Sequence, residues 1–358
     1  MNTPAPEEPS LLGELQELAY AQCIPLNMSL ELTLRCNIRC THCYNFDRDL
    51  PRPTPAPELS YPEILGLLDD FRREGTLYLS LTGGEAMVHP RFWDILDEAA
   101  ARRFVITVLS NGTLLTPEAC DRFAPYVALA GLSLSVYGAR PETHDAVTRV
   151  PGSFERTWSG ARRLRERGTG VAVKFVIMKG NASEAGEMIR MAKEEEFTYS
   201  VDTTITGRYD GTQGSLNTRV DPELLESLYR GPLRDELTVR KSDPTDDEFK
   251  CNCARGNGAV SSTGEVYPCI STPLRAGNVR ERPFGEIWRN SEVFRRIRSL
   301  RIEDFKTCAP CSLKAWCRRS PGSAVLLHGD FAGVDPWVCK EAGIIRDILG
   351  PPQESVPE

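Results

Sequence analysis

The sequence lacks the features that would send the protein to a membrane or to a nucleic acid. It has no apolar run of about 18 residues, so we expect no transmembrane helix. Met1 to Ser10 contain no basic segment followed by an apolar one, which argues against a signal peptide and favours the cytoplasm. Basic residues are not in excess, because 43 of them stand against 50 acidic ones for a net charge of −7. Neither nucleic acid nor an anionic membrane is therefore expected as a partner.

Histidine is scarce and internal repeats are missing. Of 4 histidines, His89, His144 and His328 show no partner pattern, so we expect structural or exposed roles for them. The rest of the composition, 41% apolar and 26% charged, is ordinary for a globular protein. A chain of 358 residues can bury a large core and is long enough for two domains.

Cysteine is abundant, with 12 residues. In a cytoplasmic chain, clustered cysteines bind metal or do redox chemistry more often than they form disulfides. Cys23 and Cys120 stand apart and are expected to be packed thiols. The others fall into a short loop (Cys36, Cys40, Cys43) and the last third of the chain (Cys251, Cys253, Cys269, Cys308, Cys311, Cys317, Cys339).

Residues 28–205 alternate between apolar runs of strand length and amphipathic helical stretches. Six such strand–helix steps predict a parallel sheet covered by helices, either open or closed into a partial barrel. The predicted strands are Met28–Leu34, Leu77–Leu81, Phe104–Leu109, Leu129–Val136, Val171–Met178 and Thr198–Ile205. The predicted helices lie near 60–74, 90–102, 116–124, 153–168 and 183–196.

The carboxyl ends of these strands are unusually polar. The first strand runs into the three-cysteine loop, and the second runs into Thr82-Gly83-Gly84-Glu85. Ser110 and Asn111 follow the third strand, and Ser133 and Ser135 lie near the end of the fourth. In parallel α/β folds the ligand site lies at this edge, so we expect these groups to meet at one mouth.

The rest of the chain differs in character. Residues 206–250 predict a linker with little core, although 222–230 has helical spacing. Residues 251–342 hold seven cysteines, a hairpin-like stretch at 259–267 and a predicted helix near 284–299. The tail from Pro351 is expected to be disordered.

The spacing Cys36-x3-Cys40-x2-Cys43 is the most informative motif. Three thiolates in one loop can hold three irons of an iron–sulfur cubane and leave the fourth iron open to a small chelating molecule. A zinc site with His42 as its fourth ligand, or plain surface thiols, are the alternatives.

The run CNIRCTHCY from Cys36 to Tyr44, at the end of a first strand, resembles the radical S-adenosylmethionine (radical SAM) superfamily. The resemblance implies a [4Fe–4S] cluster on Cys36, Cys40 and Cys43 whose open iron binds S-adenosylmethionine. It also implies reductive cleavage to a 5′-deoxyadenosyl radical, which abstracts hydrogen from a substrate, and a (β/α)6 partial barrel.

Other strand ends resemble the same family. Gly83-Gly84-Glu85 resembles its GGE motif, which binds the methionine amino group, although Ala86 replaces the usual proline. A solvated glutamate is the alternative for Glu85, a surface salt bridge for Arg149, and plain core for Tyr44 and Ile177. The resemblance implies polar contacts to the ribose and carboxylate from Ser110, Asn111, Ser133, Ser135 and Arg149, and adenine contacts from Tyr44 and Ile177.

The C-terminal cysteines resemble the SPASM extension of radical SAM enzymes, which carries two auxiliary [4Fe–4S] clusters. The resemblance implies one complete cluster on Cys308, Cys311, Cys317 and Cys339. The expected x3-Cys position after Cys317 is occupied by Pro321, which leaves the other cluster with Cys251, Cys253 and Cys269 only. We expect an open iron there, a non-cysteine ligand or a smaller cluster; a zinc ribbon is the alternative.

The predicted fold class is therefore α/β, a (β/α)6 partial TIM barrel with a small C-terminal iron–sulfur SPASM domain. The predicted parts are a lead-in at 1–27, the radical SAM barrel at 28–205, a linker at 206–250, the SPASM domain at 251–342 and a tail at 343–358.

The resemblance implies an enzyme that modifies a ribosomally made peptide by crosslinking, thioether formation, epimerisation or oxidation. Its expected partners are the precursor peptide, a small leader-peptide-binding protein (since 27 residues are too few for a fused one), and a reductase or flavodoxin as electron donor. One alternative is a dehydrogenase or epimerase acting on a sugar, aminocyclitol or tetrapyrrole. Another is a non-enzymatic iron–sulfur or zinc scaffold.

Overall fold

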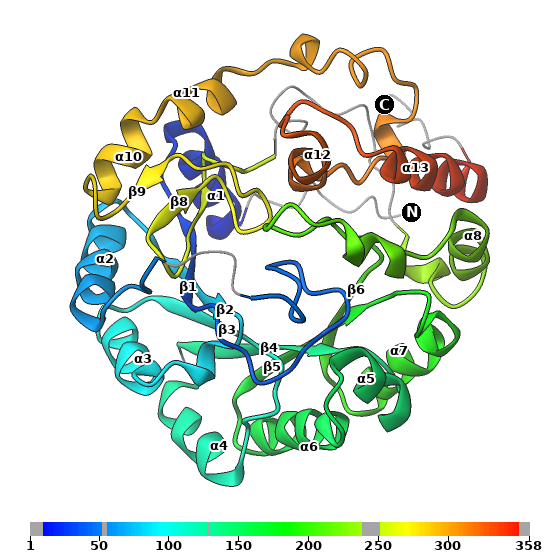
Figure 1. Cartoon of the computed structure of the whole chain (residues 1–358), viewed down its shortest axis with the longest axis horizontal. Coiled ribbons are helices and arrows are strands. Elements are labelled where there is room, and N and C mark those ends of the chain that lie inside the picture. Colours follow the sequence, from blue (N-terminus) through cyan, green and yellow to red (C-terminus); the bar gives the residue numbers. More distant parts are fainter. Residues whose placement is uncertain (1–9, 52–55, 128, 238–250, 351–358) are drawn as a thin grey trace, which may run out of the picture.

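The computed structural model describes residues 10–51, 56–127, 129–237 and 251–350. All six predicted strands are present and pair in parallel, in chain order, along one curved sheet (Figure 1). The sixth is shorter than predicted and ends at Asp202. The strands are β1 (Asn27–Thr33), β2 (Tyr78–Gly83), β3 (Val105–Ser110), β4 (Ala130–Val136), β5 (Gly170–Val176) and β6 (Thr198–Asp202).

The five predicted helices cover the outer face of this sheet (Figure 1). They are α2 (Tyr61–Arg73), α3 (Phe92–Ala101), α4 (Pro117–Phe123), α6 (Ser153–Glu166) and α7 (Ala185–Glu194). In α2, a capping box between Ser60 and Glu63 starts the helix, and one apolar face is buried. On β1, Leu30 and Leu32 pack into the same core, so Glu31 points to the inner side of the sheet.

A sixth helix, α5 (Pro141–Thr148), was not predicted. It has eight residues and little amphipathic contrast, so its sequence carries a weak helical signal. It lies directly after β4, where it supplies backbone carbonyls to the cysteine loop.

The sheet continues beyond the predicted barrel. Strand β7 (Asn257–Val260) pairs in parallel with β1, and β8 (Glu265–Tyr267) and β9 (Gly277–Asn278) follow as antiparallel neighbours. The hairpin predicted at 259–267 is thus confirmed, but its insertion beside β1 was not foreseen. The order β6-β5-β4-β3-β2-β1-β7-β8-β9 does not close, so the α/β fold is a partial barrel.

The helical predictions for the last third need two corrections. The single helix expected at 284–299 is two, α10 (Phe284–Asn290) and α11 (Glu292–Ser299), because the backbone of Ser291 is extended. Two further helices, α12 (Pro321–His328) and α13 (Pro336–Leu349), were not predicted. Helix α1 (Leu11–Gln22) forms the lead-in. Short 3-10 turns are η1 (Ala86–Val88), η2 (Ala124–Tyr126), η3 (Ala182–Glu184), η4 (Gly214–Thr218), η5 (Arg234–Glu236), η6 (Ile302–Asp304) and η7 (Lys314–Trp316).

The predicted linker is not poor in core where the structure describes it. Helix α8 (Pro222–Arg230) confirms the helical spacing and buries Leu225 and Tyr229 in the main core, next to α13. The ion pair between Arg219 and Asp335 also joins the two segments, at 2.5 Å. The domain boundaries themselves stay a prediction. The prediction for the tail from Pro351 lies outside the described residues, and among those described no helix has the length and apolarity to cross a membrane.

Candidate active site at the carboxyl ends of the strands

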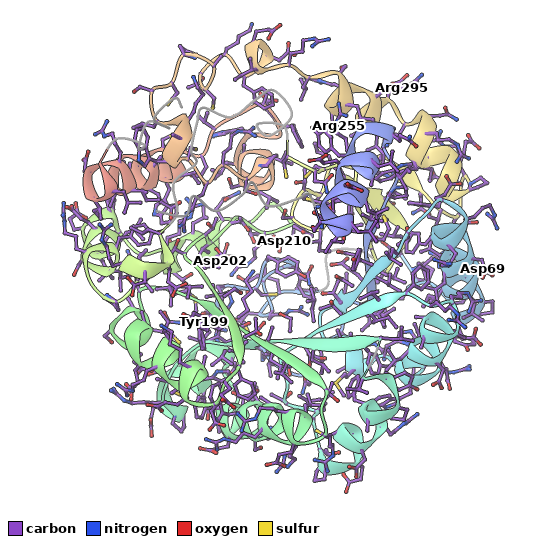
Figure 2. The ribbon with its side chains drawn as sticks, turned by 180° about the vertical axis from the view of Figure 1, so that it is seen from behind. Asp69, Tyr199, Asp202, Asp210, Arg255 and Arg295 are labelled. Carbon is purple, nitrogen blue, oxygen red and sulfur yellow. The ribbon has the colours of Figure 1, made fainter. Side chains whose placement is uncertain are left out.

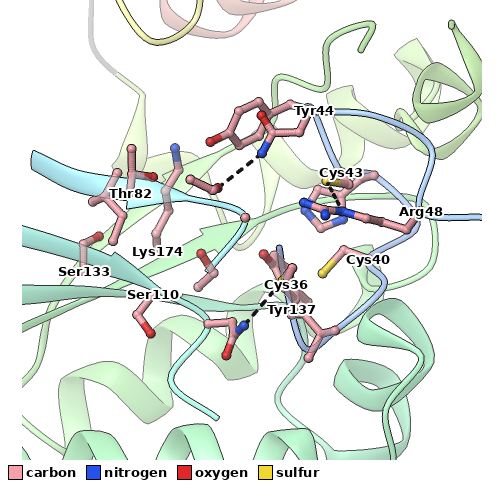
Figure 3. A pocket seen from close by; sticks show the side chains of 18 residues that line it. Cys36, Cys40, Cys43, Tyr44, Arg48, Thr82, Ser110, Ser133, Tyr137 and Lys174 are labelled. Carbon is pink, nitrogen blue, oxygen red and sulfur yellow. Dashed lines mark hydrogen bonds between the residues drawn. The ribbon is translucent and has the colours of Figure 1, made fainter. Parts of the chain in front are cut away.

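A cavity of about 210 Å³ lies at the carboxyl ends of the strands, as the sequence predicted (Figure 3). Its wall comes from the loop after β1 and from the ends of β2 to β5, so side chains distant in sequence face one space. The lining residues are Cys36, Ile38, Cys40, His42, Cys43, Tyr44, Asn45, Arg48, Thr82, Gly83, Gly84, Leu109, Ser110, Asn111, Ser133, Ser135, Tyr137 and Lys174.

The cysteine loop is held on one side by the C-terminal end of α5. The backbone N–H of Arg39 donates to the carbonyl of Thr148 at 2.9 Å, and that of Thr41 donates to Val147 at 3.1 Å. Free carbonyls at the end of a helix need such donors. The unpredicted helix therefore fixes the position of the three cysteines.

The segment after β6 holds the loop from the other side. Buried Arg208 donates from Nε to the carbonyl of Cys43 at 3.2 Å and from Nη2 to that of Thr41 at 3.3 Å. It also pairs with Asp47 at 3.2 Å. Arg208 therefore fixes the backbone of the cysteine loop from this side.

The three cysteines line one cavity, as the ligands of one cluster must. Burial raises the pKa of Cys36 and Cys40, so these thiols keep their protons until a metal displaces them. Arg48 donates from Nε to the sulfur of Cys43 at 3.3 Å, and Asn111 donates to the sulfur of Cys36 at 3.8 Å. Such hydrogen bonds to sulfur tune iron–sulfur sites.

A single ion does not match the geometry as well. No three His, Cys, Asp or Glu side chains in the described ranges converge tightly enough to surround one ion. A cluster of several irons takes ligands that stand farther apart. His42, the fourth ligand of the zinc alternative, has no partner for its buried Nδ1 in the described part of the chain, and burial lowers its pKa to about 4.

Gly83 and Gly84 are required by the way the end of β2 meets the start of the cysteine loop. A Cβ on Gly84 would lie 2.3 Å from the carbonyl oxygen of Arg35, and one on Gly83 would lie 2.2 Å from that of Thr33. Gly83 also has a φ of +133°, which side chains disfavour. The N–H of Gly84 donates to Thr33 at 2.7 Å, which joins the two strand ends.

Glu85 is buried and directed toward the end of β3. Its carboxylate accepts hydrogen bonds from Ser110 Oγ at 2.9 Å and from the N–H of Asn111 at 2.7 Å. It also accepts from the N–H of Met87 at 3.2 Å. Glu85 does not line the cavity, and its predicted contact with an amino group stays a prediction.

The other predicted ligand contacts are placed unequally. Ser133, Ser135 and Tyr44 line the cavity. Arg149 does not: it forms an exposed ion pair with Asp49, the alternative that the sequence had left open. Ile177 is buried in the core and also does not line it.

Thr82, expected at the mouth with the end of the second strand, lines the cavity, and so does Tyr137 after the fourth strand. Sequence reasoning missed Asn45 and Arg48, which carry no motif and reach the cavity only through the folding of their loop. Lys174 of β5 also lines the cavity (Figure 3). Its ammonium group pairs with Asp202 at 3.1 Å. Asp202 lies at the end of β6 (Figure 2).

The C-terminal cysteines gather in a second region. The sulfur of Cys253 lies 3.2 Å from that of Cys269 and 3.8 Å from that of Cys251. The hydroxyls of Ser271 and Thr272 are each 3.2 Å from the sulfur of Cys269. These three cysteines are thus close neighbours despite the single residue between Cys251 and Cys253.

The remaining four cysteines also approach one another. Burial raises the pKa of Cys308, Cys317 and Cys339, and at least one other cysteine of the four raises each of these pKa values further. Pro321, at the position where the resemblance implies a cysteine, starts α12, and the next residue, Gly322, packs against the backbone of Ser271. Position 321 therefore lies near the segment that contains Cys269, and the proline there cannot supply a sulfur ligand.

Comparison with protein families gives two matches. Residues 30–194 match the radical SAM superfamily, and residues 251–312 match SPASM, described as an iron–sulfur cluster-binding domain. The second match ends before Cys317 and Cys339.

Similar proteins cover most of the chain. The AdoMet-dependent heme synthase of Methanosarcina barkeri is 29% identical over 89% of this chain and 97% of its own length. The mycofactocin maturase MftC of Mycobacterium tuberculosis is 27% identical over 87% of this chain and 82% of its own. Among solved structures, Streptococcus suis SuiB bound to its precursor peptide SuiA superimposes with a TM-score of 0.66 at 15% identity, covering 95% and 84% of the two chains. That last likeness shows the fold.

Proposed function

We propose that this chain, a radical SAM enzyme with a C-terminal SPASM domain, modifies a ribosomally made peptide. The enzyme binds a [4Fe–4S] cluster, S-adenosylmethionine and auxiliary iron–sulfur clusters. When bound, this cofactor set supplies a 5′-deoxyadenosyl radical that removes a hydrogen atom from substrate. Crosslinking, thioether formation, epimerisation and oxidation are the outcomes open to it.

Similar proteins are the observation that supports a peptide substrate. The mycofactocin maturase MftC of Mycobacterium tuberculosis is similar over 87% of this chain, and the antilisterial bacteriocin subtilosin biosynthesis protein AlbA of Bacillus subtilis over 76% of it. The cavity, lined by the three cysteines, is the place for the cluster and S-adenosylmethionine, and the substrate would lie beside them.

The assignment of ligands is part of the proposal. Cys36, Cys40 and Cys43 would hold the cluster that binds S-adenosylmethionine, with Arg48 and Asn111 donating to their sulfurs. Glu85 would meet the methionine amino group and Arg149 its carboxylate. Polar contacts would come from Ser110, Asn111, Ser133 and Ser135, and adenine contacts from Tyr44 and Ile177.

The auxiliary clusters complete the assignment. Cys308, Cys311, Cys317 and Cys339 would hold one cluster. Cys251, Cys253 and Cys269 would hold the other with an iron left open to a non-cysteine group, because position 321 is proline. Such clusters are oxygen-sensitive, which fits an anaerobic or protected cytoplasm. A reductase or flavodoxin would supply electrons, and a small leader-binding protein would present the peptide.

A tetrapyrrole substrate is the second candidate. It is favoured by the heme synthase of Methanosarcina barkeri, which is similar over 97% of its length.

Deuterium transfer separates the two candidates. The reconstituted enzyme is reduced with dithionite and mixed with S-adenosylmethionine. One sample receives deuterated synthetic peptides, with the sequences of short open reading frames next to the gene. The other sample receives a deuterated porphyrin that carries carboxylates. We expect 5′-deoxyadenosine to gain deuterium from a peptide. Deuterium gained only from the porphyrin would overturn the peptide proposal and support the second candidate.

A further inference from the structure

A buried polar cluster lies between the cysteine loop and the C-terminal cysteines, and the proposed ligand assignment does not use its central residue. Its centre is Glu31 on β1, which is 3% exposed and opposite Thr82 of β2 in the sheet register. Among the residues that the structure describes, Oε1 of Glu31 has no hydrogen-bond partner, and neither does the buried hydroxyl of Tyr209. Leaving such groups unsatisfied costs free energy, so a further hydrogen bond or a proton at either group would be favourable.

Glu31 connects to the cavity through two lining residues. The hydroxyl of Tyr44 is hydrogen-bonded to the side chain of Thr82, and Tyr44 is close enough to Glu31 for the carboxylate to raise the pKa of the phenol. Glu31 is therefore a neighbour of two hydroxyl-bearing residues of the cavity wall, Tyr44 and Thr82.

Glu31 also connects to the C-terminal cysteines. Tyr209 packs edge-on against Tyr44, with ring centroids 5.3 Å apart, and its backbone N–H donates to the carbonyl of Tyr44 at 2.9 Å. The phenol of Tyr209 is near both Glu31 and Cys269, each of which raises its pKa. A charge placed at the Cys251, Cys253 and Cys269 site would thus be felt at Glu31 across one aromatic ring.

The groups that face Glu31 can be named from each packed element. They are Tyr44 and Arg48 of the cysteine loop, Tyr209 of the segment after β6, and Tyr267 of β8. The backbone N–H of Ser262, in the turn after β7, donates to the carboxylate. Burial raises the pKa of all three phenols, so these hydroxyls keep their protons near neutral pH.

Glu31 is the one member of this group that can take up a proton. Burial raises its pKa to about 7, while Ser262 N–H and Arg48 limit the rise, so both of its charge states are accessible. Lys174 and Arg48, the two cations of the cavity wall, cannot accept a proton while they are charged, and Lys174 is already paired with Asp202.

We propose that Glu31 is the proton acceptor coupled to electron transfer into the iron–sulfur cluster at Cys251, Cys253 and Cys269. This inference rests on the proposed function, because it requires the auxiliary cluster at these three cysteines. After hydrogen-atom removal, a substrate radical that forms a new double bond or crosslink must lose one electron and one proton. The electron reduces the oxidised cluster, and the proton converts the Glu31 carboxylate to the carboxylic acid, so charge at the junction stays balanced.

The test is a redox titration that needs no peptide. The reconstituted full-length protein is reduced stepwise between pH 5.5 and about pH 8.5, and each cluster is followed by electron paramagnetic resonance. We expect the equilibrium constant for reduction of one cluster to fall by up to about tenfold per pH unit as the pH rises through the range where Glu31 titrates. The reason is that one proton is taken up for each electron. Glu31→Gln, which keeps an oxygen for the Ser262 N–H, should remove this pH dependence.

Glu184→Gln is the matched control, because Glu184 is also buried but its carboxylate is fully engaged by Ala139 N–H, Arg140 N–H and the Thr143 hydroxyl. The control should keep the wild-type pH dependence. A pH dependence that survives in Glu31→Gln, or one that is missing from the wild type while the cluster signals are present, would overturn the proposal.

A second measurement uses the wild type alone and so does not depend on the variant folding. Redox-difference infrared spectra should show a carboxylic-acid C=O band that appears on reduction; its absence would also overturn the proposal. Missing cluster signals would instead contradict the assignment of the auxiliary site. Failure of the peptide test leaves this titration unaffected.

Discussion

The two cysteine regions are built in opposite ways. The Cys36–Cys43 loop is fixed by the fold, since α5 supplies carbonyls on one side and Arg208 clamps the backbone on the other. Between Leu300 and Pro321, by contrast, the only regular elements are the 3-10 turns η6 and η7, and Cys308, Cys311 and Cys317 all lie in this stretch. The first site is therefore preorganised for its cluster, whereas the second depends on its cluster for order.

Removing the ligands of the preorganised site should have the largest effect on activity and little effect on the fold. We expect Cys36→Ala, Cys40→Ala and Cys43→Ala together to reduce 5′-deoxyadenosine formation to background and to lower bound iron by about four per chain. Because the loop is held by backbone hydrogen bonds, far-ultraviolet circular dichroism should stay unchanged. Iron content and cleavage at wild-type levels would contradict the assignment of this loop.

Removing metal should disorder the second region more than the first. Metal sites in segments with little regular structure contribute directly to folding free energy. Hydrogen exchange on the apo and reconstituted proteins should show loss of protection around 301–320, while 36–44 changes little. Equal loss in both regions would show that the loop is not preorganised.

Glu31, between the two regions, should make stability depend on pH. Burial raises its folded-state pKa from 4.5 to about 7, so the folded state holds the proton more tightly than the unfolded chain. Stability is therefore greatest below about pH 4.5 and falls as pH rises to about 7, by about 3 kcal/mol relative to Glu31→Gln. Anaerobic denaturant titrations of both proteins measure this difference, and parallel pH profiles would refute it.

The smallest expected effect is a loss of stability, and it is measured by comparing substitutions of two arginines near the cysteine loop. Arg208→Gln removes a buried clamp and should cost about 2–3 kcal/mol of stability and slow S-adenosylmethionine cleavage. Arg149→Gln removes an exposed ion pair with Asp49 and should cost at most about 1 kcal/mol.

The same pair of variants tests a role that the structure leaves as a prediction. If Arg149 binds the carboxylate of S-adenosylmethionine, Arg149→Gln will raise the KM for S-adenosylmethionine without lowering the melting temperature. An unchanged KM would leave Arg149 with its surface ion pair alone.

Local periodicity was enough to predict the barrel but not its completion. The six strands and five helices carry strong alternation, and the strand ends led to the cavity residues from Cys36 to Ser135. Helix α5 was missed because eight residues with little amphipathic contrast resemble a loop. The pairing of β7 with β1 joins segments more than two hundred residues apart, and no local pattern encodes such a partner.

The site shows the same limit. Arg48 lines the cavity only because its loop turns it inward, so no spacing rule could find it, whereas Thr82 was expected there at the end of its strand. Arg149 and Ile177, chosen from the resemblance, lie outside the lining. Motif residues fixed by backbone geometry, such as Gly83 and Gly84, were the most predictable, because their side chains are excluded for steric reasons.

The position of β7 also has a consequence for the order of biosynthesis. During translation β1 emerges early and β2 can cover one of its edges, but the other edge must wait for residues 257–260. Until then the ribosome-bound chain carries an open strand edge, a template for unwanted pairing. A chain truncated before β7 would keep that edge permanently, so the C-terminal third protects the nascent barrel as well as carrying cysteines.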